Sequence, residues 1–304
     1  MIATNTRPMP PAPNQQRGPT GRTIVRWCSI GVVALLVAGG VIVGMSHRAS
    51  QSDITAHELR IKELATAAGP VPVDASAITE LPEPVQRWIE FTFDDPAAAD
   101  GAYVEFGIEG DFRRPLTDGF NPLTGSQTTA INEPALVFSG TTTVFPGLWA
   151  LAYDAYADGG MEMKAKILST ITVVDETETP ELNQTSLQRW LLMTPLYPTA
   201  LLPGGQVSWE PVDAGRARAS VEAHGSEASL LFTFADDGSI SQIDAETDGD
   251  LTTSYHGAGE HLAVDDYRRL DGVMLPHDVV VARAADGVRF PFLDGVITGY
   301  TFHP

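Results

Sequence analysis

The sequence contains little cysteine and few basic residues. Cys28 is the single cysteine among 304 residues, so a domain built from the rest of the chain cannot depend on disulfide bonds. Cys28 also precedes the long apolar segment, whereas the lipidated cysteine of a lipoprotein follows one. Lysine and arginine number 19 against 39 acids, for a formal net charge of −20. Such an acidic chain repels phosphate backbones, which argues against nucleic acid as a partner.

Short motifs of familiar chemistry are absent as well. There is no Gly-x-Ser-x-Gly, no His-Glu-x-x-His, no P-loop and no glycine-rich dinucleotide fingerprint. Acids are so numerous that no pair stands out as a general acid and base. The sequence therefore predicts no catalytic residue and no cofactor, and it favours a function other than catalysis.

One long uncharged run is present near the start. The 19 residues from Trp27 to Met45 carry no charge, and as a helix they would be about 28 Å long, close to the hydrocarbon core of a bilayer. Arg22 and Arg26 lie just before this run, and residues 1–50 contain no acid. By the positive-inside rule, the N-terminus is expected in the cytoplasm and the remainder outside. The prediction is a single-pass signal-anchor in the cell membrane.

Two further points concern this segment. A cleavable signal peptide is the competing interpretation, but its apolar region would be shorter and a small-x-small cleavage site would follow. Gly40 and Gly44 have the GxxxG spacing that lets two membrane helices approach closely, which would permit a helix-mediated homodimer. With four glycines among these 19 residues, the spacing also arises easily by chance.

The chain divides into four expected parts. Residues 1–21 predict a disordered cytoplasmic tail, residues 22–47 the transmembrane anchor, residues 48–79 a juxtamembrane helix and linker, and residues 80–304 an extracytoplasmic β-rich domain. Residues 51–304 hold 14 basic residues against all 39 acids, so the outer part has a balance of −25.

Beyond residue 101 the apolar period changes from 3.6 to 2. Alternation is clear in residues 161–167, 216–223 and 230–234, and it is typical of antiparallel strands with one buried face. Turn sequences separate the strands: Asp158-Gly159-Gly160, Asp236-Asp237-Gly238, Asp271-Gly272 and Asp286-Gly287. Such short connections leave no room for crossover helices, so an antiparallel meander is predicted.

Two helices accompany these strands. Leu81-Pro82-Glu83-Pro84 predicts a helix start, with Val85, Trp88 and Ile89 on its buried face. Thr179-Pro180-Glu181 starts a second helix, which Pro195 and Pro198 break. The predicted fold class is therefore α+β: a curved, half-barrel-like antiparallel sheet with a broken helix on its concave face, preceded by one transmembrane helix.

Several short phrases resemble an uncharacterised bacterial family, the domain of unknown function 6544. They are found in residues 81–88, 154–160, 187–191, 197–203, 209–210, 232–238 and 272–276. The resemblance covers roughly residues 80–302 and implies no known activity. Its order of elements is similar to that of bacterial lipoprotein-carrier domains, which wrap a half-barrel sheet around helices. Met193 stands where an acid often occurs in the family, and the stretch before Asp154 is shorter.

An apolar patch around the broken helix is the candidate ligand site. Its expected members are Trp149, Tyr153, Trp190, Met193, Leu196 and Tyr197. Ordinary core is the default interpretation of the patch, because the residues have helical spacing, and an apolar ligand pocket is the competing one. His256 and His261 flank a glycine turn and are weak candidate metal ligands, but two such histidines are more often solvated loop residues.

The function favoured by the sequence is a membrane-anchored extracytoplasmic module that binds a lipid or another apolar ligand. An envelope scaffold or interaction protein without a ligand cavity is the alternative, and a hydrolase is less favoured. The volume of a cavity beside the broken helix would distinguish the first two.

Overall fold

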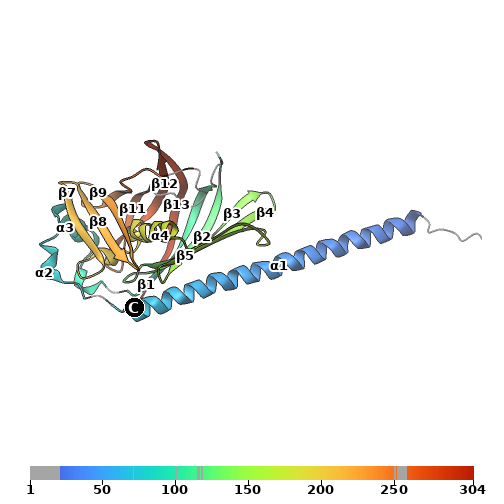
Figure 1. Ribbon diagram of the computed structural model, residues 1–304, viewed down its shortest axis with the longest axis horizontal. Helices are drawn as coiled ribbons and strands as arrows, with labels where there is room; N and C mark the ends of the chain where they lie inside the picture. The colour runs from blue at the N-terminus through green and yellow to red at the C-terminus, as the bar shows by residue number, and fades with distance from the viewer. Residues whose placement is uncertain are drawn as a thin grey trace, which may run out of the picture. The chain divides into compact units, whose positions relative to one another are not determined.

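The folded part of the chain is a single sheet of 13 antiparallel strands. In the computed structural model, residues 21–70, 72–99, 101–114, 117, 119–249, 251 and 259–304 are described, with side chains from residue 30 onward. The sheet order is β6-β5-β4-β3-β2-β1-β13-β12-β11-β10-β9-β8-β7, so every neighbour but one is consecutive in sequence. The exception is the antiparallel pairing of β1 with β13. The sheet is curved and unclosed, as Figure 1 shows, which confirms the predicted meander.

The strands have the following bounds. One half of the sheet consists of β1 (Tyr103–Arg113), β2 (Phe120–Ala130), β3 (Ala135–Phe145), β4 (Leu148–Ala157), β5 (Gly160–Ile167) and β6 (Ile171–Thr177). The other half consists of β7 (Val207–Asp213), β8 (Arg216–Ala223), β9 (Ser226–Phe234), β10 (Ile240–Asp244), β11 (Glu260–Leu270), β12 (Val273–Ala285) and β13 (Val288–His303).

Asp-Gly turns join several of these strands. Asp158 and Gly159 have φ values of 53° and 79°, and the pairs Asp271-Gly272 and Asp286-Gly287 likewise have positive φ at both positions. Two consecutive residues with positive φ are required by the hairpin turn whose twist matches that of the strands, and Asp-Gly suits it. The turns expected from the sequence are therefore confirmed at these three places.

Short helices pack on the sheet. Helix α3 (Glu83–Thr92) buries Val85, Trp88 and Ile89 as predicted, with exposed fractions of 0–2%. Helix α4 (Pro180–Leu192) begins at Thr179, whose hydroxyl accepts a hydrogen bond from the Leu182 amide at 3.2 Å. Two 3₁₀ turns follow, η2 (Thr194–Leu196) and η3 (Pro198–Leu201), so the helix is broken where the prolines predicted. The remaining short helices are α2 (Ala75–Ile78) and η1 (Pro96–Ala98).

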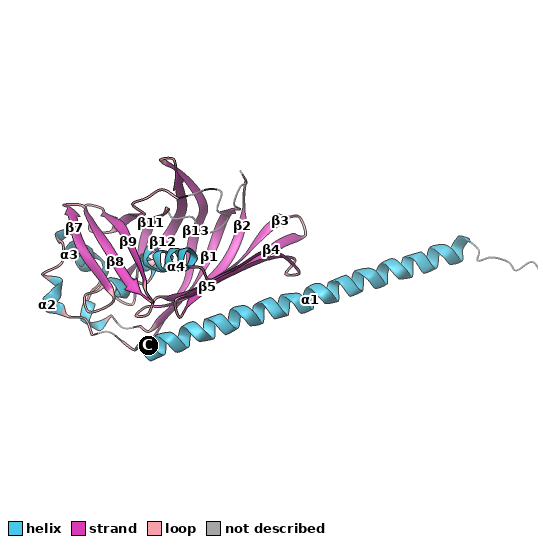
Figure 2. Cartoon of the chain, in the orientation of Figure 1, coloured by secondary structure: helices cyan, strands magenta, loops and turns pink. Residues whose placement is uncertain are grey.

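Helix α4 lies against strands of both halves of the sheet. It contacts β3, β4 and β5 on one side and β8, β9 and β11 on the other, and Figure 2 shows it beside these strands. The main core is formed around it and includes the fully buried side chains of Trp88, Trp190, Tyr197 and Phe232.

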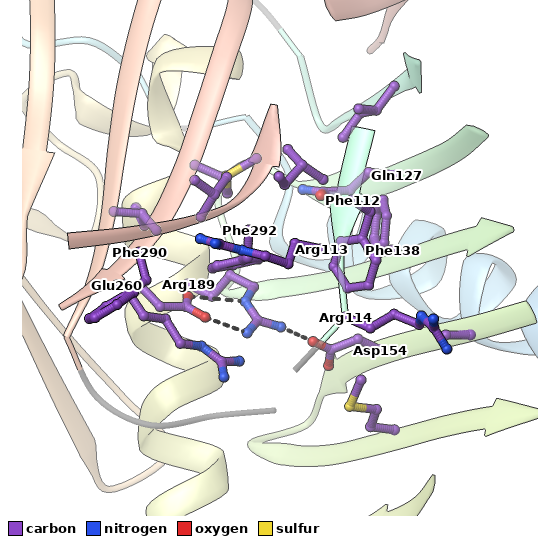
Figure 3. A pocket seen from close by; sticks show the side chains of 18 of the residues that line it. Phe112, Arg113, Arg114, Gln127, Phe138, Asp154, Arg189, Glu260, Phe290 and Phe292 are labelled. Carbon is purple, nitrogen blue, oxygen red and sulfur yellow. Dashed lines mark hydrogen bonds and ion pairs between the residues drawn. The ribbon is translucent and has the colours of Figure 1, made fainter. Parts of the chain in front are cut away.

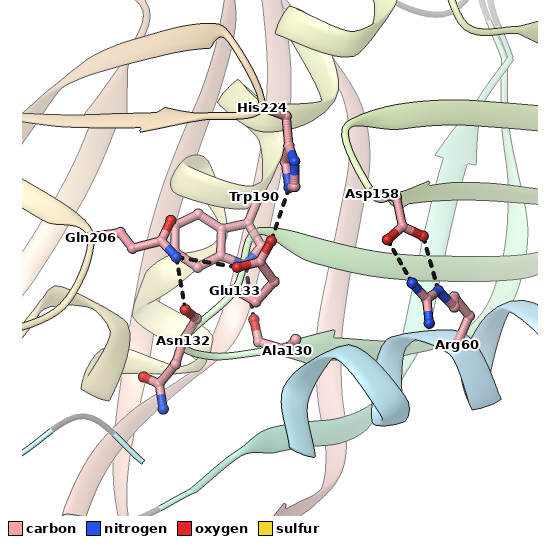
Figure 4. Close-up of polar contacts among 8 residues, drawn as sticks. All are labelled: Arg60, Ala130, Asn132, Glu133, Asp158, Trp190, Gln206 and His224. Atoms are coloured by element: carbon pink, nitrogen blue, oxygen red, sulfur yellow. Dashed lines mark hydrogen bonds and ion pairs between the residues drawn. The ribbon is translucent and has the colours of Figure 1, made fainter. Parts of the chain in front are cut away.

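Polar contacts also tie the two halves together at one end (Figure 4). The Glu133 carboxylate, in the β2–β3 turn, lies 2.9 Å from His224 Nε2 in the β8–β9 turn. The Gln206 side chain donates to the backbone carbonyl of Asn132 at 3.0 Å and to Glu133 at 3.3 Å. Hairpin ends far apart in the strand order therefore meet through side chains.

Contacts divide the chain into two units, Met1–Met45 and Ser46–Pro304. Helix α1 (Gly21–Ala68) begins in the first unit and ends in the second without a break, so the anchor and the juxtamembrane helix expected separately form one helix. In the first unit, large apolar side chains from Ile30 to Met45 are exposed, Leu35 by 75% and Leu36 by 71%. Among the described residues, α1 is the one helix whose length and apolar composition suffice to cross a membrane, as an anchor or a signal sequence would.

The end of α1 that belongs to the second unit packs on the sheet. Ile61 and Ala65 are fully buried against an alanine-rich surface of β2, β3 and β4, and Ile54 packs on Leu151 and Tyr153. Small side chains on the strands allow this close approach. Lys62 pairs with Glu105 at 2.7 Å, and Arg60 pairs with Asp158 at 2.6 Å. The sequence predicted a juxtamembrane helix here, and this part of α1 packs on the sheet.

Candidate functional site

A cavity of about 450 Å³ lies between α4 and the inner face of the sheet. Strands of both halves of the sheet and one side of α4 line it (Figure 3). Its apolar walls are formed by Ile108, Phe112, Phe138, Ala152, Met163, Leu192, Met193, Leu251, Val281, Phe290, Phe292 and Leu293. The volume falls in the range of about 300–1,000 Å³ that is typical of small-molecule sites.

Strand alternation directs these aromatic side chains to the cavity. Ile108 and Phe112 lie on one face of β1 because successive side chains of a strand point to opposite faces. Phe290 and Phe292 are two residues apart on β13 and share a face for the same reason. The rings of Phe112 and Phe292 meet edge to face, with centroids 6.3 Å apart. The wall opposite α4 is therefore built from paired aromatic rings.

Three charged side chains of the cavity lining, Arg189, Asp154 and Glu260, form a group of ion pairs beside α4. Arg189 Nη2 lies 2.9 Å from Glu260 Oε1, and Arg189 Nε donates to Glu260 Oε2 at 3.3 Å. Arg189 Nη1 also donates to the carboxylate of Asp154. Asp154 and Glu260 are 4% and 2% exposed, so both carboxylates are buried in contact with the guanidinium. Buried carboxylates require such partners, because desolvation of an unpaired charge is costly.

More arginines line the same cavity than acids. Arg113 ends β1, Arg114 follows it, and Arg283 lies on β12 on the same face as Val281. The Arg113 guanidinium lies 5.1 Å from the centroid of the Phe120 ring, and that of Arg283 lies 5.2 Å from the centroid of the Phe292 ring. Cation–π contacts of this kind hold a guanidinium in place.

The structure separates the six residues predicted to bind a ligand. Met193 contributes to the cavity wall. Tyr153 borders the cavity, but its ring packs on Ile54 and lies 5.3 Å from the His57 ring, on the opposite face of β4 from Asp154. Trp149, partly exposed on β4, is outside the lining.

Trp190, Leu196 and Tyr197 belong to the filled core. Trp190 Nε1 donates to the Ala130 carbonyl at 2.9 Å, and the Tyr197 hydroxyl donates to the Trp190 carbonyl at 2.5 Å. Burial raises the pKa of Tyr197 well above its ordinary value. The cavity adjoins Arg189 and Leu192 of α4 and Met193 just after it, whereas Leu187, Trp190 and Leu191 are outside the cavity lining. Leu192 and Met193 are also part of the buried core.

Of the two candidate metal ligands, the structure describes His261. His256 lies outside the described residues. His261 is 7% exposed, and its Nδ1 lies 2.7 Å from Asp244 Oδ1. In the part of the chain that the structure describes, no three histidine, cysteine, aspartate or glutamate side chains cluster as metal ligands would.

Sequence reasoning missed most of the cavity. The pair Arg113-Arg114 in an acidic chain and the alternating Phe290 and Phe292 were signals that could have indicated it. Asp154 and Arg189 belong to two of the segments that carry the family resemblance, residues 154–160 and 187–191. Their contact depends on how α4 lies on the sheet.

Comparison with models of known protein families gives a match. The model of a family of unknown function, DUF6920, matches residues 79–302. The chain belongs to this family. The match does not confirm the resemblance to the domain of unknown function 6544. A comparison with curated proteins finds no match.

Solved structures that are similar to this DUF6920 chain at low identity include the following three. A LolA superfamily protein from Nitrosomonas europaea is 9% identical with a TM-score of 0.36, covering 73% of this chain and 92% of its own. A putative outer membrane lipoprotein-sorting protein domain from Vibrio parahaemolyticus is 8% identical with a TM-score of 0.37, covering 74% and 93%. A DUF1329 family protein from Desulfovibrio piger is 8% identical with a TM-score of 0.37, covering 72% and 91%.

Proposed function

We propose that this chain is a membrane-anchored, extracytoplasmic module that binds a lipid or another apolar ligand in the cavity beside α4. The observation that carries the proposal is a cavity of about 450 Å³ whose lining is mostly apolar. Protein interiors pack nearly as densely as organic crystals, and voids larger than a water molecule are few. A scaffold with a filled core would have no reason to keep such a space.

The broken helix on the concave face of the sheet is the part of the fold that makes the cavity. Leu192 and Met193 form its wall on α4, and the aromatic side chains of β1 and β13 form the opposite wall. Methionine adapts its shape to different apolar partners, which suits a site for a flexible chain. The site fits a ligand whose buried part is mostly hydrocarbon.

The anchor is proposed from the exposed apolar side chains of residues 30–45 together with the arginines before them. An apolar helix surface on every side is typical of a membrane span. Arg22 and Arg26 before this segment support a cytoplasmic N-terminus under the positive-inside rule, which would put the domain and its cavity outside.

Native mass spectrometry of the fragment Ser46–Pro304 tests the binding function. The fragment starts at Ser46 because Ile54, Ile61 and Ala65 are buried in the domain, and all three clusters of its core come from residues after Ser46. Purified from cells without detergent, the fragment should carry an added mass that organic extraction releases as a lipid. A fragment that is free of ligand, and that takes up no lipid when lipids are offered, would contradict the proposal.

A further inference from the structure

The charge of the cavity is opposite to that of the domain around it. Residues 51–304 hold 14 basic residues against 39 acids. Among the described residues that line the cavity, the basic residues are Arg113, Arg114, Arg189 and Arg283, and the acids are Asp154 and Glu260. More than a quarter of the basic residues of this acidic part therefore gather around one apolar space. A requirement for solubility does not explain this distribution, because arginines beside aromatic walls do little for solubility.

The roles of these arginines differ. Arg189 neutralises Asp154 and Glu260, whose carboxylates are both buried against it. Arg113, Arg114 and Arg283 are held by other elements, at the end of β1 and on β12. Arg283 stands in register between Glu260 of β11 and Phe290 of β13. Its guanidinium lies over the Phe292 ring, at the aromatic wall of the cavity.

An apolar space bordered by guanidinium groups matches an amphiphile with an anionic head. Guanidinium groups recognise carboxylate and phosphate oxygens through paired, charge-assisted hydrogen bonds. The low dielectric of an apolar cavity strengthens this attraction relative to water. A neutral hydrocarbon would gain no binding free energy from charge-assisted contacts with the arginines, and it would lie beside charged groups that it cannot pair with.

We propose that the ligand is an amphiphile with an acidic head, a carboxylate or a phosphate monoester, whose chain lies against the aromatic and aliphatic walls and whose head meets Arg113, Arg114 and Arg283. This inference rests on the proposed function and adds the chemical class of the ligand. The positive cavity selects the acidic head, while the −25 balance of residues 51–304 repels anionic surfaces from the outside.

Matched ligands with one chain and different heads test the inference on the fragment Ser46–Pro304. The probes are dodecanoate, dodecyl phosphate, dodecanol and dodecyltrimethylammonium, each below its micelle-forming concentration, together with inorganic phosphate. Isothermal titration calorimetry should give both acids an affinity at least about tenfold higher than that of dodecanol, as one charge-assisted contact predicts. Dodecyltrimethylammonium and inorganic phosphate should bind more weakly than the acids.

Arginine variants assign the effect to the site. Arg283→Gln and Arg114→Gln should each weaken binding of dodecanoate about tenfold and leave binding of dodecanol unchanged. Arg216→Gln is the matched control, since Arg216 lies on β8 outside the lining and pairs with Asp213 at 2.7 Å. Circular dichroism confirms that each variant is folded, and two independent variants keep the test valid if one of them is not.

The other outcomes overturn the inference in distinguishable ways. Equal affinity for dodecanoate and dodecanol would reject the acidic head and leave the proposed apolar-ligand function intact. Equal affinity for inorganic phosphate and dodecyl phosphate would show that the site takes free phosphate rather than an amphiphile. Failure of every probe with a dodecyl chain to bind would reject the inference and the proposed function together.

Discussion

The Arg189 guanidinium lies 2.9 Å from the Glu260 carboxylate and joins α4 to β11 at the edge of the cavity. The same guanidinium contacts Asp154 on β4, so one side chain connects the helix to both halves of the sheet. The charges do not make this group strongly stabilising by themselves, because desolvation offsets much of the attraction between buried ions. Its consequence is geometric: the side of α4 that carries Leu192 and Met193 is held toward the cavity.

Breaking this ionic group should destabilise the domain more than removing a surface ion pair. Arg189→Met leaves Asp154 and Glu260 buried without their shared cation, and we expect a loss of about 3–5 kcal/mol in the free energy of unfolding. Urea unfolding followed by tryptophan fluorescence measures it. Arg216→Met removes an exposed pair with Asp213 and should cost less than about 1 kcal/mol. Similar losses in the free energy of unfolding for the two variants would show that the buried ion pairs matter no more for stability than the exposed pair.

Filling the cavity should block binding without unfolding the domain. Ala152 lines the cavity on β4, and Ala152→Phe places a ring in the space where a ligand chain would lie. Lipid co-purifying with the variant, measured by native mass spectrometry, should fall to a small fraction of that of the unmodified fragment. Ala150→Phe is the control, since Ala150 points to the same face of the same strand but lies outside the lining. Undiminished lipid in Ala152→Phe would place the ligand elsewhere.

Trp190 should matter for stability and not for ligand affinity. Trp190→Phe removes the indole N–H that donates to the buried Ala130 carbonyl, so we expect the free energy of unfolding to fall by about 1–3 kcal/mol. The dissociation constant of dodecanoate, measured by calorimetry on the folded variant, should stay within a factor of two of the unmodified value. If affinity fell sharply while stability was unchanged, Trp190 would be a ligand contact after all.

Attachment of the end of α1 to the sheet should weaken in acid. The Arg60 hydrogen bond lowers the pKa of Asp158, and although burial acts to raise the pKa of Glu105, contacts with Lys62 and His303 hold it below its ordinary value. A carboxylate whose pKa is depressed by folding stabilises the folded state fully above its unfolded pKa, near 3.8 for Asp158 and 4.5 for Glu105. That contribution disappears as the pH falls through the folded-state pKa.

Hydrogen exchange of the amides of residues 54–66 reports this attachment. After correction for intrinsic rates, their protection should be constant between pH 6 and 7 and should fall below pH 4. Asp158→Asn should show lower protection at pH 6 and a smaller change on acidification. Protection that increases on acidification would contradict the sign of the expected effect.

The proposed topology predicts labelling at the surface of intact cells. In a Cys28→Ser background, Asp286→Cys places a thiol in the exposed turn between β12 and β13. A membrane-impermeant maleimide should label this thiol in intact cells. Asn14→Cys, in the predicted cytoplasmic tail, should be labelled only after lysis. The reverse pattern would invert the topology.

Local chemistry determined much of this protein from sequence alone. The Asp-Gly pairs at 158–159, 271–272 and 286–287 suit tight turns because both residues take positive φ there, and period-2 patterns such as that of residues 216–223 define strands with one buried face. Thr179 and Pro180 set the start of α4, and prolines 195 and 198 end its regular turns, since each acts on its own neighbours. The apolar run of residues 27–45 indicated a membrane span by length alone.

The tertiary structure alone decided where the site lies. Trp190 and Met193 are three residues apart and both buried, yet Met193 lines the cavity and Trp190 does not, and the sequence does not say which side of an apolar helix meets empty space. Asp154, Arg189 and Glu260 meet across more than 100 residues because α4 bridges both halves of the curved sheet. The pairing of β1 with β13 likewise brings Phe112 beside Phe292. Long-range contacts depend on how every intervening strand pairs, and a cavity is what remains where that packing leaves space.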